Sequence, residues 1–112
     1  MRYLENRQYV IVARNYRKKC GELDVVAKKD GVLHFVEVKA GSWHGPWPEE
    51  GVDQYSPLDH MHRAKRERLA RIIQVYIDAH AIECTWTCDV AEVLIDPRSR
   101  KARVRLYEDV AL

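Results

Sequence analysis

Four ionisable residues flank an Asp-Gly pair, and their types and spacing suit metal-dependent hydrolysis. Glu22 and Asp24 precede the pair at 30–31, while Glu37 and Lys39 follow it. An Asp-Gly pair between alternating hydrophobic residues is a strong β-hairpin signal. Side chains at positions i and i+2 of a strand point to the same face. A hairpin would therefore gather all four side chains on one face.

The register of this hairpin depends on its turn. A two-residue turn places Asp24 opposite Glu37, and Glu22 opposite Lys39, with Cβ atoms about 4.5–5.5 Å apart. A four-residue turn places Glu22 opposite Glu37 and keeps the charged residues on one face, whereas a β-bulge would shift the register and break the arrangement. Val26 and Phe35 would share the charged face. The opposite face is predicted to pack on a core because it is apolar: Val25, Ala27, Val36 and Val38.

The oxygen atoms of this cluster are suited to binding a hard cation. Crowded carboxylates raise each other's pKa. Oxygens from Asp24, Glu37 and the main-chain carbonyl of Val38 suit Mg²⁺, with waters completing an octahedron. Lys39 beside that cation would orient and deprotonate an attacking water. The alternative is a surface charge ladder, because a Glu-x-Lys spacing is expected roughly 0.6 times in a chain of this composition.

The elements that must position these residues alternate between strand and helix patterns. We expect the end of a helix at residues 2–8, strands at 9–13, 23–27 and 33–38, a helix from Asp59 to near His80, and strands at 85–95 and 102–107. Residues 40–58 contain three Gly and three Pro, which predicts a long loop. The order predicts an α/β fold, with a mixed sheet of about five strands flanked by helices, in one domain over residues 1–112.

Composition and charge narrow the class of protein. The 112 residues are 46% hydrophobic and carry a net charge of +2, which is typical of a globular chain. No apolar run approaches the roughly 20 residues of a membrane span. Residues 1–20 carry a net charge of +5, residues 21–59 of −5 and residues 60–80 of +3. An acidic centre between basic segments favours a cation site beside a surface that attracts an anion.

The basic residues form two clusters that are candidates for nucleic-acid binding. Each cluster would contact phosphates or, as the alternative, form a solvated face. The candidates are Arg17, Lys18, Lys19, Arg63, Lys65, Arg66 and Arg68. Trp43 and Trp47 would stack on unpaired bases or pack on the domain.

The cysteines and the first residues of the chain give information about the cellular compartment of the protein. Cys20, Cys84 and Cys88 are odd in number and irregularly spaced, so we expect buried or half-buried free thiols and no disulfide framework. The first residues lack the hydrophobic stretch of a signal peptide. Both observations favour a cytoplasmic protein.

Several runs in the chain resemble the bacterial UPF0102 family, also called YraN. Residues 15–17 read Asn-Tyr-Arg, residues 21–27 read GELDVVA, and residues 35–39 read FVEVK. The family pattern continues into a helix with a Lys and an Arg-Leu pair, which Lys65 and residues 68–69 match here. The resemblance covers nearly the whole chain.

The resemblance implies a restriction-endonuclease-like fold of the PD-(D/E)xK superfamily, similar to archaeal Holliday-junction resolvases. In that superfamily, an acidic residue on the second strand and Glu-x-Lys on the third bind Mg²⁺ and cut phosphodiesters. Carried over, this implies that Asp24, Glu37 and Lys39 are catalytic, with Glu22 in support. The family pattern begins with a longer helix that carries a further Glu. No residue at the start of this chain matches that Glu, so we expect its first helix to be shortened.

We therefore expect an endonuclease that uses Mg²⁺ or Mn²⁺ and acts on structured or branched DNA. Its partner would be nucleic acid and not a membrane, and a homodimer is left open. One alternative is a non-catalytic nucleic-acid-binding module of the same fold. Another is a protein-interaction domain whose acidic loop, with Glu49, Glu50 and Asp53, recruits a basic partner.

Overall fold

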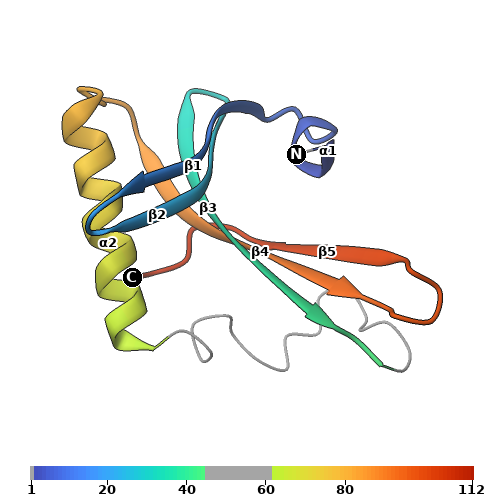
Figure 1. The fold of residues 1–112 in the computed structure, drawn as a ribbon. Coiled ribbons are helices and arrows are strands. Elements are labelled where there is room, and N and C mark those ends of the chain that lie inside the picture. Colours follow the sequence, from blue (N-terminus) through green and yellow to red (C-terminus); the bar gives the residue numbers. More distant parts are fainter. Residues whose placement is uncertain (1, 45–61) are drawn as a thin grey trace.

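In the part of the chain that the structure describes, a five-stranded sheet lies between a long helix and a short one (Figure 1). The computed structural model describes residues 2–44 and 62–112. Its elements are α1 (Arg2–Glu5), β1 (Val10–Lys18), β2 (Gly21–Lys29), β3 (Val32–Ser42), α2 (Arg63–Ala79), β4 (Trp86–Ile95) and β5 (Ala102–Tyr107). Neighbouring strands follow chain order and are antiparallel, except that β3 and β4 are parallel. The predicted mixed α/β fold is confirmed.

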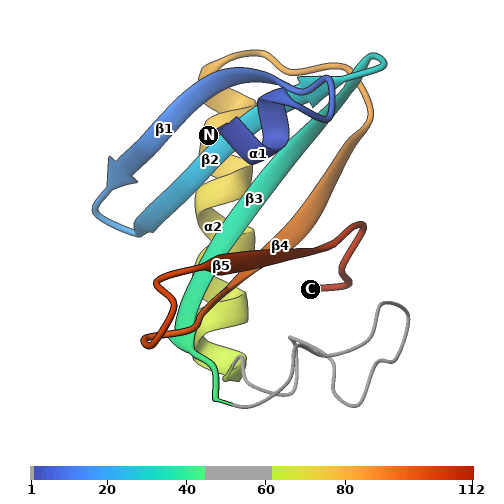
Figure 2. The same ribbon diagram turned by 90° about the vertical axis from the view of Figure 1, so that its right-hand side faces the viewer.

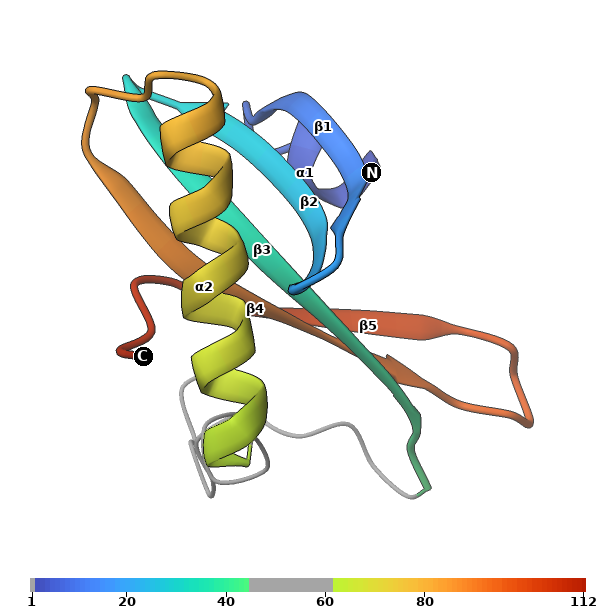
Figure 3. The ribbon, with the colours of Figure 1, turned by 60° about the vertical axis from the view of Figure 1, so that its left-hand side comes forward.

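The sheet is covered on both faces, by α2 on one and by α1 on the other (Figures 2 and 3). Val26 and Phe35 pack with Ile72 of α2 in the first core. Val25 and Val36 pack with α1 in the second core. The predicted division of β2 and β3 into two faces is therefore confirmed, and it follows from the two-residue repeat of a strand.

The β2–β3 hairpin has the two-residue turn. Asp30 and Gly31 have φ angles of 51° and 77°, and positive φ at both positions is typical of a type I′ turn. Pairing starts at Lys29–Val32 and ends at Val25–Val36. The prediction that direct pairing extends to Asp24 and Glu37, and on to Glu22 and Lys39, is wrong, because the backbone ladder stops one step earlier.

Several element boundaries differ from the sequence prediction. The strand β3 runs on to Ser42 because β4 pairs with it as far as Ile95, a partner that local sequence does not reveal. The helix α2 begins at Arg63, with His62 as its N-cap, and not at the predicted Asp59. Asp59 lies outside the described residues. Other predictions that fall outside them concern Trp47, Glu49, Glu50 and Asp53.

The described residues contain no helix long and apolar enough to cross a membrane. The three cysteines are free thiols. Cys88 is buried and Cys20 is half-buried, as predicted. Cys84 is exposed, contrary to the prediction, because it lies in the connection between α2 and β4 and not inside the strand.

Candidate active site

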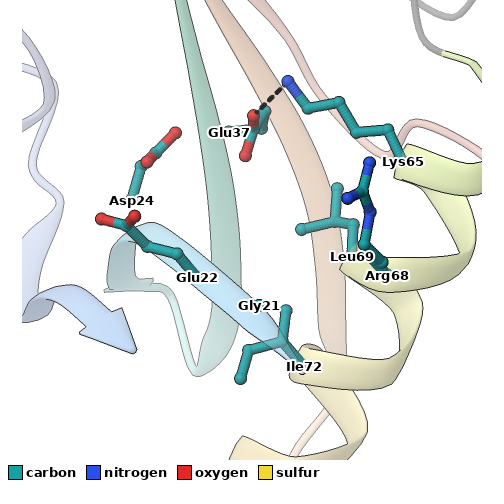
Figure 4. A pocket seen from close by; sticks show the side chains of 8 residues that line it. All are labelled: Gly21, Glu22, Asp24, Glu37, Lys65, Arg68, Leu69 and Ile72. Carbon is teal, nitrogen blue, oxygen red and sulfur yellow. Dashed lines mark ion pairs between the residues drawn. The ribbon is translucent and has the colours of Figure 1, made fainter. Parts of the chain in front are cut away.

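A cavity of about 410 Å³ lies between the start of β2, the middle of β3 and the first turns of α2 (Figure 4). Its lining combines three acidic and two basic side chains with apolar groups from α2. The lining residues are Gly21, Glu22, Asp24, Glu37, Lys65, Arg68, Leu69 and Ile72. Four sequence-predicted site residues, Asp24, Glu37, Lys65 and Arg68, thus line one cavity together with the predicted support residue Glu22.

Where the backbone pairing of β2 and β3 ends, a hydrogen bond to the Asp24 side chain links the two strands. The Oδ2 atom of Asp24 accepts a hydrogen bond from the Val38 amide at 2.8 Å. Asn15, the β1 residue across from Asp24, has a φ of 51°. The residues on either side of Asn15 pair with β2, but Asn15 itself does not pair with Asp24. This local irregularity leaves Asp24 half-buried between the cavity and a second hollow of about 380 Å³.

The carboxylate of Glu37 is buried and paired with a lysine. Its Oε1 atom lies 3.0 Å from Lys65 Nζ, and the two side chains are 10% and 44% exposed. Burial raises the pKa of Glu37 above 4.5; Lys65 opposes that effect and Asp24 adds to it. The expected rise in pKa is thus found at Glu37, and burial, not crowding, is its largest cause.

Lys39 lies outside the lining of the cavity. It is the register partner of Glu92 in β4, and Glu92 in turn pairs with Arg105 in β5. Burial lowers the pKa of Lys39, and the charge of Lys65 lowers it further, while Glu37 and Glu92 oppose this. Lys39 is thus within electrostatic reach of Glu37 and also belongs to a row of charged residues across three strands.

The remaining predicted binding residues are distributed over several places. Arg17 pairs with Glu22 at 3.1 Å, which brings together a predicted phosphate contact and a predicted catalytic support. Lys18 Nζ lies 5.3 Å from the centroid of the Tyr16 ring, and Lys19 is exposed between β1 and β2.

The basic residues of α2 divide between two sides of the helix. Lys65 and Arg68 line the cavity. Arg63 and Arg66 line a different hollow, next to the C-terminal Leu112. An α-helix turns about 100° per residue, so a cluster that is contiguous in sequence cannot all face one site.

Comparison with known proteins supports the family resemblance. The sequence matches the model of "Uncharacterised protein family UPF0102" over residues 1–95. This chain belongs to the UPF0102 family. It is 30% identical over 105 residues to a UPF0102 protein of Roseiflexus castenholzii, covering 92% of this chain and 78% of that protein.

Two further relatives match over different lengths of the chain. A UPF0102 protein of Clostridium botulinum is 28% identical over 109 residues, covering 96% of this chain and 82% of the relative. One from Campylobacter lari is 53% identical over 38 residues, which is 34% of each chain. The predicted family membership is confirmed.

Sequence reasoning missed two features of this UPF0102 protein's site. Gly21 has a φ of +156°, a backbone conformation that residues with a side chain rarely adopt. A Cβ there would make only ordinary contact with Ile72 Cβ, at 3.6 Å, so the backbone conformation and not the spacing calls for glycine. The position of Gly21 directly before Glu22 was the sequence signal that could have indicated its place at the site. Glu92 had no such signal, because only the parallel pairing of β3 and β4 brings it beside Lys39.

The acidic residues fit a weakly bound Mg²⁺ ion. Mg²⁺ is commonly held by one or two carboxylates while it keeps several waters. Asp24 and Glu37 line one cavity and would supply such a pair. In the part of the chain that the structure describes, no three His, Cys, Asp or Glu side chains converge as a fuller ligand set. Waters would therefore occupy most of the coordination sphere, and the binding should be weak.

Proposed function

We propose that this UPF0102 protein is an endonuclease that uses Mg²⁺ or Mn²⁺ to hydrolyse phosphodiester bonds in structured or branched DNA. The observation that carries the proposal is the convergence of Asp24 and Glu37 with Lys65 and Arg68 on one cavity (Figure 4). Carboxylates can hold a divalent cation, and basic side chains can bind phosphate. The resemblance to the PD-(D/E)xK superfamily supports the same reaction.

Each group of the site has a role in this proposal. Asp24, Glu37 and the carbonyl of Val38 would hold the cation. When bound, Mg²⁺ would polarise the scissile phosphate and acidify a coordinated water. Lys65 and Arg68 would bind the phosphate oxygens. Lys39 would orient the attacking water. Its lowered pKa leaves a larger fraction of the amine neutral, and therefore able to accept a proton, than in an exposed lysine.

The test of the proposal is metal-dependent cleavage. End-labelled flap, four-way-junction and single-stranded DNAs are incubated with the protein and Mg²⁺ or Mn²⁺. We expect the wild-type protein to cleave the branched substrates. Asp24→Asn and Glu37→Gln should each abolish this cleavage. Glu67→Gln is the matched control, because Glu67 is an exposed carboxylate of α2 that pairs with Arg63 outside the cavity. It should cleave like wild type.

The role of Lys39 is tested separately from DNA binding. Lys39→Ala should reduce cleavage by about 10²–10⁴-fold, the usual contribution of acid–base groups, and leave DNA affinity nearly unchanged. Equal cleavage by Lys39→Ala and wild type would remove Lys39 from the mechanism. DNA binding by wild type without cleavage of any substrate would favour the non-catalytic module. The proposal also assumes a cytoplasmic location.

A further inference from the structure

We infer that Lys65 couples the two ligands of the site: its ammonium group holds Glu37 in the metal-free protein and moves to a DNA phosphate when a divalent cation binds. This inference rests on the proposed function and concerns how its metal and nucleic acid depend on each other. Its starting point is the contact between Lys65 Nζ and Glu37 Oε1 at 3.0 Å.

The two partners of this ion pair differ in their freedom to move. Glu37 lies in the central strand β3, where it pairs with Val90 of β4, and its side chain is 10% exposed. Lys65 lies in the first turn of α2 with its side chain 44% exposed. A lysine stem can bury its methylenes and keep the ammonium group in water. Glu37 must therefore stay in the cavity, whereas Lys65 can leave it.

The charges make the two positive partners of Glu37 compete. A buried carboxylate is costly when it is ionised and unpaired, so a cation must stay beside Glu37 for as long as it is charged. Lys65 supplies that cation in the metal-free protein. A divalent ion on the same carboxylate would lie within a few ångströms of the ammonium group, and like charges at that distance repel strongly in a partly buried site. Binding of the metal thus favours the release of Lys65.

A phosphate is the natural acceptor for the released ammonium group. Arg68 lies one turn further along α2 and lines the same cavity, and side chains three residues apart are neighbours on a helix. Arg68 forms no ion pair with any residue that the structure describes. Lys65 and Arg68 together could bind one phosphate. DNA would then draw Lys65 away from Glu37 and strengthen metal binding, and by linkage the metal would strengthen DNA binding equally.

Mn²⁺ binding provides a test that does not depend on cleavage. Free Mn²⁺ is measured by electron paramagnetic resonance, with and without a saturating phosphorothioate oligonucleotide that resists hydrolysis. Without DNA, Lys65→Met should bind Mn²⁺ about fivefold or more tightly than wild type, the lower range of common couplings. The oligonucleotide should tighten Mn²⁺ binding to wild type by a similar factor and leave Lys65→Met unchanged.

Arg68→Met is the matched control for loss of one positive charge from the same cavity. It should tighten Mn²⁺ binding less than Lys65→Met does and should keep the effect of the oligonucleotide. Equal effects of the two substitutions, or no effect of DNA on wild type, would overturn the coupling. If wild type and Glu37→Gln bind Mn²⁺ equally, the metal is not at Glu37, and the proposed function fails as well.

Discussion

Glu37, in the central strand β3, combines burial of a charged side chain with a close ion pair. It is the most buried of the charged side chains that line the cavity, and it keeps a cation within 3.0 Å. Burial disfavours the ionised carboxylate, while Lys65 favours it. The balance leaves the pKa of Glu37 raised, so ionisation of this side chain should weaken the metal-free fold.

In the metal-free protein, we therefore expect Glu37→Gln to raise the free energy of unfolding at pH 7. Because the folded-state pKa lies above 4.5, the folded protein holds this proton more tightly than the unfolded chain does. The contribution of Glu37 to stability is present below its unfolded pKa and is lost as the pH rises through the folded pKa. The advantage of Gln should shrink as the pH falls towards 4.5.

Urea unfolding between pH 4 and pH 8 with a chelator present measures this difference. A lower stability of Glu37→Gln at pH 7 would show that the pair with Lys65 outweighs the burial of the charge.

At the scale of elements, the separation of β2 from β3 creates the cavity. The type I′ turn aligns the strands as far as Val25 and Val36, and beyond that point the Asp24 side chain bonds to the Val38 amide. Asp24 thus has a structural task as well as its proposed metal-binding one. An amide side chain keeps an oxygen acceptor but loses the charge, so substitution can separate the two tasks.

We expect Asp24→Asn to abolish Mn²⁺ binding while it keeps most of the stability. Asp24→Ala should abolish binding and also lower the free energy of unfolding by about 1–3 kcal/mol, because the Val38 N–H loses its acceptor. Chemical denaturation and Mn²⁺ titration of both variants measure the two effects. Equal stability of the Asn and Ala variants would mean that the hydrogen bond contributes little to holding β2 and β3.

The two sides of α2 should differ in DNA binding. Arg68 lines the cavity, whereas Arg66 lines the hollow beside Leu112. Arg68→Ala should weaken binding about equally for all DNA sequences and lower the slope of log affinity against log salt by roughly one unit. Arg66→Ala should have a smaller effect. Fluorescence anisotropy at several salt concentrations compares them, and a larger effect of Arg66→Ala would place the DNA on the other side of α2.

At the scale of the whole molecule, a polar network lies on the sheet face opposite α2. Asp89 is fully buried, and its carboxylate contacts His34 Nδ1 at 2.6 Å and accepts hydrogen bonds from Thr87 at 2.8 Å and from the Asp109 amide at 3.1 Å. Nearby, the Tyr9 hydroxyl donates to Glu108 at 2.5 Å. The network joins the start of β1, the middle of the sheet and the C-terminal segment.

Asp89→Ala should lower the free energy of unfolding by about 3 kcal/mol, because it leaves several buried polar partners of Asp89 unsatisfied. Asp78→Ala is the exposed control: Asp78 accepts a hydrogen bond from Gln74 on the surface of α2, and its loss should change stability by no more than about 0.5 kcal/mol. Guanidinium unfolding measures both. Similar losses in the two variants would mean that the network is not a main support of the fold.

Sequence alone determined the features that depend on neighbouring residues. The Asp30-Gly31 pair predicted the hairpin, and the two-residue turn that the structure contains was one of the two turns considered, because only a few turn types match the twist of paired strands. The two-residue repeat separated Val26 and Phe35 from Val25 and Val36. The existence and order of the five strands and the long helix followed from the same local patterns, and short runs around Glu22 and Glu37 were sufficient to indicate the UPF0102 family.

The tertiary structure decided which of the predicted residues meet. Lys65 reaches Glu37 because α2, which follows β3 in the chain and precedes β4, packs on one face of the sheet. Lys39 lies beside Glu92 because the parallel strands β3 and β4 pair in one particular register. These contacts join residues tens of positions apart. They depend on how helix and sheet bury their apolar faces together, which no local pattern specifies. For the same physical reason, Lys65 and Arg68 enter the cavity while Arg63 and Arg66 do not.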